Sequence, residues 1–309
     1  MTNLIGNTTR RSFDTTADQV FSLGGELPVR RIGFGTMRLT DERPADPAAA
    51  PVWRGPVDRD GALAVLRAAV GLGVDLVDTA DAYALGESEE LVAEALHPYR
   101  EGVVVATKVG VVRPAPDAWV PLGHPAYLRQ QAELALRRLR VDRLDLLQLH
   151  RIDPEYPLAD QIGALAQLRD EGKVRHIGLS EVTVGQLREA DAITPIASVQ
   201  NMYNLGFRQH EAVLDYATER SIAFIPFFPV AMGAHAGPDG PVAEIARELG
   251  ATPAQTALAW LLHRSPVVLP IPGTTSVAHL RENVEALDVR LNAEQLARLS
   301  DLEPAPEGA

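Results

Sequence analysis

Four polar residues of different chemical types stand where apolar runs of the sequence end. Asp78, Lys108 and His150 each follow a short apolar run, and Tyr83 comes five residues after Asp78. A carboxylate, an ammonium, an imidazole and a phenol that meet at one place can transfer a proton to or from a reacting oxygen. Lys108 is notable because the chain holds 29 Lys and Arg residues, of which only Lys108 and Lys173 are Lys. Lys is a compact point charge whose own pKa can be tuned by its surroundings, which Arg offers less well.

The composition is that of an ordinary globular protein. The chain has 309 residues, 46% of them hydrophobic and 23% charged, which allows one large domain or two smaller ones. The net charge of −12 argues against a nucleic-acid or anionic membrane surface. The absence of Cys excludes disulfides, thiolate nucleophiles and Cys-ligated metals, and the scattered His residues predict no metal site. With no apolar segment in residues 1–19 and no long apolar run elsewhere, we expect a cytoplasmic protein without a membrane partner.

Short apolar runs alternate with amphipathic stretches along the chain. The predicted strands are 31–35, 74–78, 103–107, 144–149, 174–179, 197–200, 222–226 and 267–269. The predicted helices are 58–70, 87–97, 125–139, 158–171, 183–191, 209–219, 242–249, 253–263, 276–287 and 292–302. Strands that are apolar throughout and alternate with helices predict a parallel sheet covered by helices.

Eight such units predict an α/β fold of the (β/α)8 TIM barrel type. A doubly wound sheet needs a G-x-G-x-x-G segment after its first strand, and neither residues 33–38 nor 71–76 complete one. Residues 20–24 and 27–31 flank Gly24-Gly25-Glu26 and predict an N-terminal β-hairpin that closes the bottom of the barrel. We expect a flexible segment at 1–19, a single barrel domain at 20–309 and extra C-terminal helices. In a barrel the strand ends meet at one pocket, which would bring the four polar residues together.

The order and spacing of the strand-end motifs resemble the aldo-keto reductase family from about residue 20 to residue 302. The matching stretches are Gly33-Phe34-Gly35-Thr36-Met37, Asp78-Thr79-Ala80 with Tyr83, Thr107-Lys108, Leu149-His150, the run from Gly172 to Ser180, Val199-Gln200-Asn201 with Tyr203-Asn204, and Ile271-Pro272-Gly273-Thr274 with Glu282-Asn283. The resemblance implies a reductase in which Tyr83 is the acid, Lys108 and Asp78 tune it, and a neutral His150 orients the carbonyl. A free Tyr is too weak an acid, and a neighbouring ammonium lowers its pKa.

The resemblance also implies a nicotinamide cofactor. It assigns the carboxamide to Ser180, residue 181 and Gln200, and the stacking aromatic to Phe227. The usual residue at position 181 is Asn; Glu181 accepts but does not donate when ionised. Further implied cofactor contacts are Gly35, Thr36, Met37, Gly273, Thr274, Thr275, Ser276, His279, Glu282 and Asn283.

The segment from Gly273 to Ser276 leads into a helix, so its backbone N–H groups suit a phosphate. Many family members have Arg at position 275. The hydroxyls of Thr275 and Ser276 can donate to a 2′-phosphate, which favours NADPH and leaves NADH open.

The substrate is the least determined part. The loops at 41–57 and 113–124 should form the walls of the pocket, with Trp53 and Trp119 as candidate substrate contacts. Residues 225–229 and 273–283 resemble the bacterial pyridoxal reductase branch of the family. A tailoring ketoreductase of secondary metabolism and a redox-sensing nicotinamide-binding regulatory protein are the alternatives. The short-chain dehydrogenase pattern Tyr-x-x-x-Lys is absent from the sequence.

Overall fold

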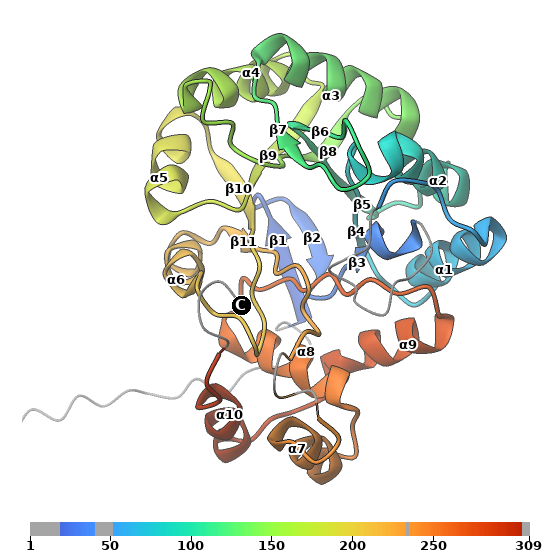
Figure 1. Cartoon of the computed structure of the whole chain (residues 1–309), viewed down its shortest axis with the longest axis vertical. Coiled ribbons are helices and arrows are strands. Elements are labelled where there is room, and N and C mark those ends of the chain that lie inside the picture. Colours follow the sequence, from blue (N-terminus) through green and yellow to red (C-terminus); the bar gives the residue numbers. More distant parts are fainter. Residues whose placement is uncertain (1–18, 41–51, 233–234, 236, 305–309) are drawn as a thin grey trace, which may run out of the picture.

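A parallel sheet forms the centre of the structure (Figure 1). The computed structural model describes residues 19–40, 52–232, 235 and 237–304. In this part of the chain the sheet has seven strands in the order β11-β10-β9-β8-β5-β4-β3. Their bounds are β3 Phe34–Gly35, β4 Leu76–Asp78, β5 Val104–Val109, β8 Leu144–Leu149, β9 Val174–Ser180, β10 Ile196–Gln200 and β11 Ala223–Phe224. All but residue 19 of the predicted N-terminal segment 1–19 lies outside the described residues.

The predicted eighth strand is an extended segment instead of a regular strand. Val268 forms an isolated parallel bridge with Phe224. On its other side, the Pro270 carbonyl accepts a 2.9 Å hydrogen bond from the Gly33 N–H. Pro266, Pro270 and Pro272 interrupt this segment, and because Pro has no backbone N–H, no regular ladder forms. The segment still joins β11 to the residues before β3, so the sheet curls closed and the predicted (β/α)8 barrel is confirmed.

Helices surround the barrel as the sequence pattern predicts (Figure 1). They are α1 Arg59–Gly71, α2 Glu87–Leu96, α3 Pro125–Leu139, α4 Leu158–Asp170, α5 Val184–Ile193, α6 Glu211–Arg220, α7 Pro241–Leu249, α8 Pro253–Arg264, α9 Val277–Glu285 and α10 Ala293–Ser300. Local signals fix several starts: Asp58 caps α1, and capping boxes begin α5, α8 and α10. The extra helices α7 and α10 pack on α8 and on each other.

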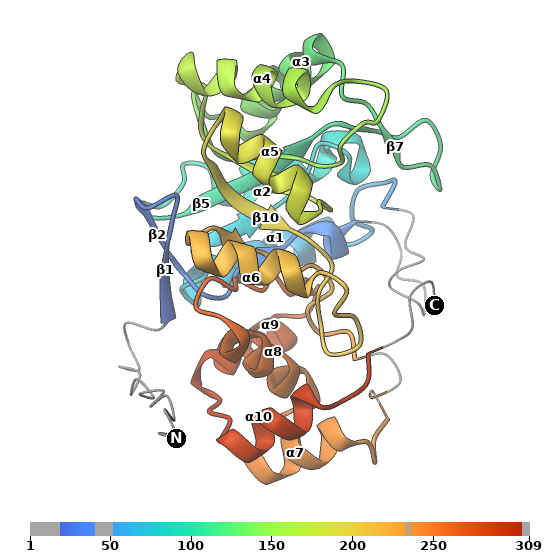
Figure 2. The same cartoon turned by 90° about the vertical axis from the view of Figure 1, so that its left-hand side faces the viewer.

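The N-terminal hairpin closes one end of the barrel, as predicted. Strands β1 (Val20–Leu23) and β2 (Leu27–Arg30) pair antiparallel. Leu23 and Val29 are fully buried in a cluster with inward-facing strand residues such as Leu76 and Leu146. Figure 2 shows the hairpin on one side of the molecule and β7 on the opposite side. The hairpin therefore leaves the other mouth of the barrel to the loops that follow the strands.

A second, unpredicted hairpin stands at that mouth. Strands β6 (Val111–Val112) and β7 (Val120–Pro121) pair antiparallel within the loop that follows β5. Trp119 directly precedes β7 and is 39% exposed. The sequence pattern missed this hairpin because each strand has only two residues and Pro114 and Pro116 lie between them. Among the helices described, none is long and apolar enough to cross a membrane.

Candidate active site

A buried ion pair lies at the centre of the site. Lys108 lies within β5, one residue beyond the end of the predicted strand 103–107. Asp78 is the last residue of the neighbouring strand β4. Lys108 Nζ donates to Asp78 Oδ2 at 2.6 Å and to the Thr79 carbonyl at 2.9 Å. Burial alone lowers the pKa of Lys108, but Asp78 and Tyr83 outweigh burial and the net shift is upward. Lys108 is therefore held as a charged ammonium.

Two amides complete the surroundings of Asp78. Gln200 and Gln148 donate to Asp78 Oδ1 at 2.9 Å and 3.2 Å. Both carboxylate oxygens thus have donors although the side chain is buried, as an internal charge requires. The sequence predicts Gln200 as a cofactor contact; here its amide also fixes the carboxylate that holds Lys108.

Tyr83 lies on the other side of Lys108. Lys108 Nζ donates to the Tyr83 hydroxyl at 3.4 Å. Tyr83 begins a short 3-10 turn, η4 (Tyr83–Gly86), in which Ala84 and Leu85 have positive φ angles of 49° and 55°. Such backbone is unfavourable for residues with a side chain and occurs where surrounding contacts enforce it, often at functional sites.

The pKa of Tyr83 shifts in the direction opposite to our prediction. Burial raises the pKa of the Tyr83 phenol, and Lys108 opposes burial without overcoming it. The ammonium does lower the pKa of the phenol, as expected, but the loss of solvation on burial raises that pKa by more. Tyr83 is consequently protonated at neutral pH, which suits a group that must hold a proton until it is transferred.

His150 stands beside Tyr83 immediately after β8. The two ring centroids are 5.9 Å apart in an edge-on arrangement. Burial, followed by the nearby charges of Lys108, Arg151 and Arg113, lowers the pKa of His150 well below its usual value. His150 is therefore neutral at physiological pH, as predicted, and can donate one ring N–H. Its Nδ1 is buried and has no hydrogen-bond partner among the described residues.

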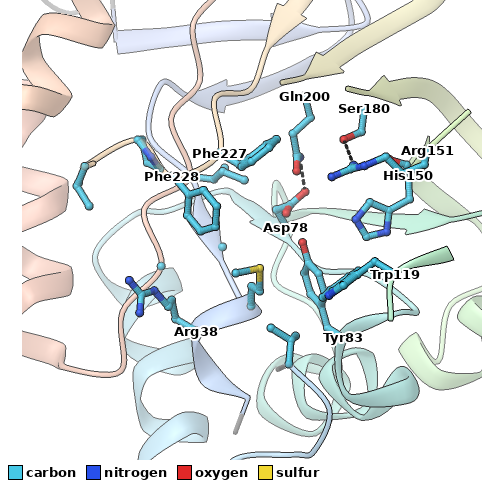
Figure 3. Close-up of a pocket in the computed structure, with 17 residues that line it drawn as sticks. Arg38, Asp78, Tyr83, Trp119, His150, Arg151, Ser180, Gln200, Phe227 and Phe228 are labelled. Carbon is cyan, nitrogen blue, oxygen red and sulfur yellow. Dashed lines mark hydrogen bonds between the residues drawn. The ribbon is translucent and has the colours of Figure 1, made fainter. Parts of the chain in front are cut away.

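These side chains open into one pocket of about 290 Å³ (Figure 3). The residues that line it include the last residues of β3, β4, β9 and β10 and residues of the loops that follow strands, which is where a barrel builds its sites. They are Gly35, Met37, Arg38, Val52, Asp78, Tyr83, Trp119, His150, Arg151, Ser180, Gln200, Phe227, Phe228, Pro229, Val230, Ile271 and Gly273. The volume is at the small end for a ligand site.

Arg113 fixes the aromatic wall of this pocket. Its guanidinium carbon lies 3.6 Å from the Trp119 ring centroid and 5.7 Å from that of Trp53. The same side chain donates to the carbonyls of Val52, Ala82, Pro116 and Ala118, which belong to three different loops. Trp119 thereby faces Tyr83 and His150 with centroid separations of 6.3 Å and 6.0 Å.

Trp53, the other predicted substrate contact, does not line the pocket and instead packs against Arg113. Residues 41–51 of the expected wall lie outside the described residues.

The residues expected to hold a nicotinamide carboxamide are only partly together. Ser180 and Gln200 line the pocket, and Phe227 lies across from them with Phe228 packed edge-on at 5.4 Å (Figure 3). Glu181 has a positive φ of 55°, and its carboxylate accepts from the Met202 N–H at 2.8 Å, away from the pocket lining. Arg151 occupies the neighbouring space, and its Nη1 donates to Ser180 Oγ at 3.1 Å.

The segment before α9 has the geometry of an anion site. Gly273 packs so closely on the loop after β3 that an added Cβ would lie 2.7 Å from the Gly35 carbonyl oxygen. Ser276 caps α9 by accepting from the His279 N–H, and Thr274 Oγ1 accepts from the Ser276 N–H. Thr275 Oγ1 is buried and has no hydrogen-bond partner among the described residues. A bound phosphate would supply the missing partner.

The remaining predicted cofactor residues lie partly in the lining of this pocket and partly outside it. Gly35 and Met37 line it, whereas Thr36 is buried and shares a 2.8 Å hydrogen bond with Ser88. His279, Glu282 and Asn283 lie on α9, where Glu282 accepts from the Thr252 hydroxyl. Asn283 is buried and His279 is exposed.

The sequence did not single out several pocket residues: Arg38, Val52, Arg151 and Phe228 line the pocket, and Arg113 supports it. The position of Arg151 in the pocket could have been inferred from the sequence, because Arg151 directly follows His150. Val52 and Arg113 lie in the loops 41–57 and 113–124 that were predicted to form the walls, but their individual positions depend on loop packing. In the described ranges, no cluster of three His, Asp or Glu side chains is arranged to hold a metal ion.

Comparison with known proteins places this geometry in a family. Residues 31–304 match the model of the aldo/keto reductase family. The chain is 44% identical to an uncharacterized oxidoreductase of Schizosaccharomyces pombe, covering 90% of this chain and 88% of that protein. It is 40% identical to pyridoxine 4-dehydrogenase of Escherichia coli, covering 93% and 99%. A crystal structure of an aldo/keto reductase from Klebsiella pneumoniae in complex with NADP and acetate is 31% identical, with a TM-score of 0.77 and coverage of 94% and 96%. The chain therefore belongs to the aldo/keto reductase family and is an oxidoreductase enzyme.

Proposed function

We propose that this enzyme reduces an aldehyde or ketone to an alcohol with NADPH, and that Tyr83 donates the proton. The observation that carries the proposal is the contact of one buried ammonium, Lys108, with both Asp78 and the Tyr83 hydroxyl. The His150 ring lies beside the Tyr83 ring in the same pocket. A carbonyl oxygen in the pocket would meet two donors, a phenol and a neutral imidazole.

The residues fit a nicotinamide cofactor. Ser180 and Gln200 offer polar partners for the carboxamide, and Phe227 offers a ring face beside them. The buried Thr275 hydroxyl, which has no hydrogen-bond partner in the described ranges, and the start of α9 suit a phosphate, which favours NADPH over NADH. The NADP in the similar Klebsiella structure supports this choice. When bound, the cofactor supplies the hydride.

The protein residues handle the proton. As a hydride from the bound cofactor would add to the carbonyl carbon and the π bond would break, the carbonyl oxygen would take the proton from the Tyr83 hydroxyl. This leaves a phenolate 3.4 Å from the charged Lys108, and the ammonium stabilises it. Asp78 keeps Lys108 charged and in position. Tyr83 regains its proton from solvent before the next cycle, so the net reaction consumes one hydride and one proton per carbonyl.

A pyridoxal-like aromatic aldehyde is the first substrate to test. The support is the 40% identity to the E. coli pyridoxine 4-dehydrogenase and a pocket walled by Trp119, Phe227 and Phe228. Aromatic faces of this kind suit a flat ring.

The experiment is an absorbance assay of NADPH and NADH oxidation across a panel of aldehydes and ketones that includes pyridoxal. We expect NADPH-dependent turnover with at least one aromatic aldehyde. Failure of the whole panel despite NADPH binding would contradict the proposed reduction and would favour the redox-sensing binding protein. Turnover of bulky ketones in preference to aldehydes would instead favour the tailoring ketoreductase.

A further inference from the structure

Arg151 is a pocket residue that the proton-transfer scheme does not use. It directly follows His150, and Figure 3 shows its guanidinium extended into the pocket between His150 and Ser180. Its Nη1 donates to the His150 carbonyl at 2.6 Å and to Ser180 Oγ at 3.1 Å. Both of these acceptors are neutral.

The charge of Arg151 lacks a carboxylate partner in the described part of the chain. No Asp or Glu oxygen described here lies within 4.0 Å of it, and the nearby Glu181 directs its carboxylate to the Met202 N–H and toward His210. Burial lowers the pKa of Arg151, although Glu181 and Tyr83 oppose that effect. A partly buried cation without a counter-charge is costly and favours the binding of an anion.

The charges around the pocket point the same way. Its charged lining residues are Arg38, Asp78 and Arg151, and Asp78 is neutralised by Lys108. Arg151 therefore gives its part of the pocket a positive charge, although the whole chain carries a net charge of −12. A cleft of one sign concentrates ligands of the opposite sign.

The two arginines serve different ends of the pocket. Arg38 lies against Gly273, beside the segment that suits the cofactor phosphates. Arg151 lies beside His150 and on the opposite side of the pocket from Arg38 (Figure 3). An anion at Arg151 is therefore an anion at the reacting end.

We propose that Arg151 is a substrate-recognition residue that selects carbonyl compounds with an anionic oxygen group, a carboxylate or an ionised phenol, next to the reacting carbonyl. This inference rests on the proposed function, since it assigns the substrate class of the same site. The planar guanidinium fork can pair with such a group. The His150 carbonyl and Ser180 Oγ hold the fork in place.

The test compares phenylglyoxylate with phenylglyoxylamide, which has the same ketone but an uncharged amide in place of the carboxylate. Calorimetry measures the binding of both compounds to the NADP+-loaded enzyme, in which no reduction occurs, and steady-state assays with NADPH give kcat/KM for each. We expect the wild-type enzyme to prefer the acid. In Arg151→Met that preference should fall about 10- to 100-fold, the loss expected for charged hydrogen bonds. Arg151→Lys keeps the charge and should retain part of it.

Arg188→Met is the matched control, because Arg188 is exposed on α5 and its loss changes the net charge equally. Arg151→Gln, which keeps a donor for Ser180 but not the charge, gives the same result if Arg151→Met does not fold. A preference for the acid that survives in both neutral variants would overturn the inference. So would a loss of NADPH affinity that weakens both ligands equally, which would assign Arg151 to the cofactor.

The two proposals fail separately. If the wild-type enzyme reduces neither ligand but its binding preference for the acid disappears in Arg151→Met, the anion site stands and the proposed reduction falls. If both compounds are reduced with equal kcat/KM and bind equally well, the reduction stands and the anion site falls.

Discussion

Lys108 Nζ lies 2.6 Å from Asp78 Oδ2, and the two side chains are 0% and 2% exposed. Because water hardly solvates either charged group, each is stabilised largely by the other. The pair also fixes the position of the ammonium relative to the Tyr83 hydroxyl. A structural interaction of the barrel interior is thus part of the proposed proton-transfer apparatus.

Substituting Lys108 with Met should therefore reduce stability as well as activity. The change leaves the Asp78 carboxylate buried without its cation, which costs about 3–5 kcal/mol. Urea denaturation monitored by circular dichroism measures the loss in the free energy of unfolding. The double variant Lys108→Met with Asp78→Asn removes the unpaired charge and should recover part of the loss. Wild-type stability in the single variant would contradict the importance of this pair.

The stability of the enzyme should fall in mild acid because of His150. Its pKa is well below 6.5 in the folded state, whereas the His side chain in the unfolded protein has a pKa of about 6.5. The unfolded state binds more protons below that pH, so the His150 contribution is present above it and is lost as the pH falls. Urea midpoints at pH 7.5 and pH 5 for the wild type and His150→Gln measure this effect.

As the pH falls, the difference in urea midpoint between the wild type and His150→Gln should shift in favour of the variant. His176 and His263 also have lowered pKa values, but both residues are present in both proteins and cancel in the comparison. Parallel pH dependence of the two proteins would show that His150 titrates normally.

Arg113 should be replaceable neither by Met nor by Lys. Its flat guanidinium serves four carbonyls and two indole rings at once, which an ammonium cannot reproduce. We expect Arg113→Lys to lower the free energy of unfolding by about 2 kcal/mol and to increase acrylamide quenching of Trp119 fluorescence. The same measurement in a Trp119→Phe background identifies the Trp119 signal, since only Trp53 and the fully buried Trp260 then fluoresce. Unchanged quenching and stability in Arg113→Lys would contradict the bracing role.

Thr275 should distinguish the two nicotinamide cofactors. If its buried hydroxyl donates to the 2′-phosphate, Thr275→Val should raise the Kd for NADPH about 10-fold and change the Kd for NADH little. Thr275→Ser keeps the hydroxyl and is the matched control. Fluorescence titration of the wild type and the two variants with each cofactor gives the six dissociation constants. If Thr275→Val weakened the binding of NADPH and NADH equally, the hydroxyl would lie at a phosphate that both cofactors share.

The sequence was sufficient for the arrangement of Asp78, Lys108 and His150. Each follows an apolar run, and parallel strands bring their carboxyl ends to one rim, so spacing along the chain translates directly into proximity. The start of α8 is also encoded locally, by the capping box of Thr252 with Gln255.

Features that depend on packing between distant loops were not predictable. Glu181 turns toward Met202 because its backbone adopts a positive φ. Trp119 reaches Tyr83 because a hairpin with strands of only two residues each and the Arg113 side chain hold it there. The upward shift in the pKa of Tyr83 depends on how completely the fold excludes water, which no local pattern records.

The central claim is that the Tyr83 hydroxyl donates the proton, and Tyr83→Phe tests it most directly. The variant keeps the ring and loses only the hydroxyl, and Tyr216→Phe, on α6, is the matched control. We predict that Tyr83→Phe binds NADPH with a Kd close to that of the wild type and that its kcat for a carbonyl substrate falls about 10²- to 10⁴-fold. Turnover at the wild-type rate in Tyr83→Phe would contradict the proposed mechanism.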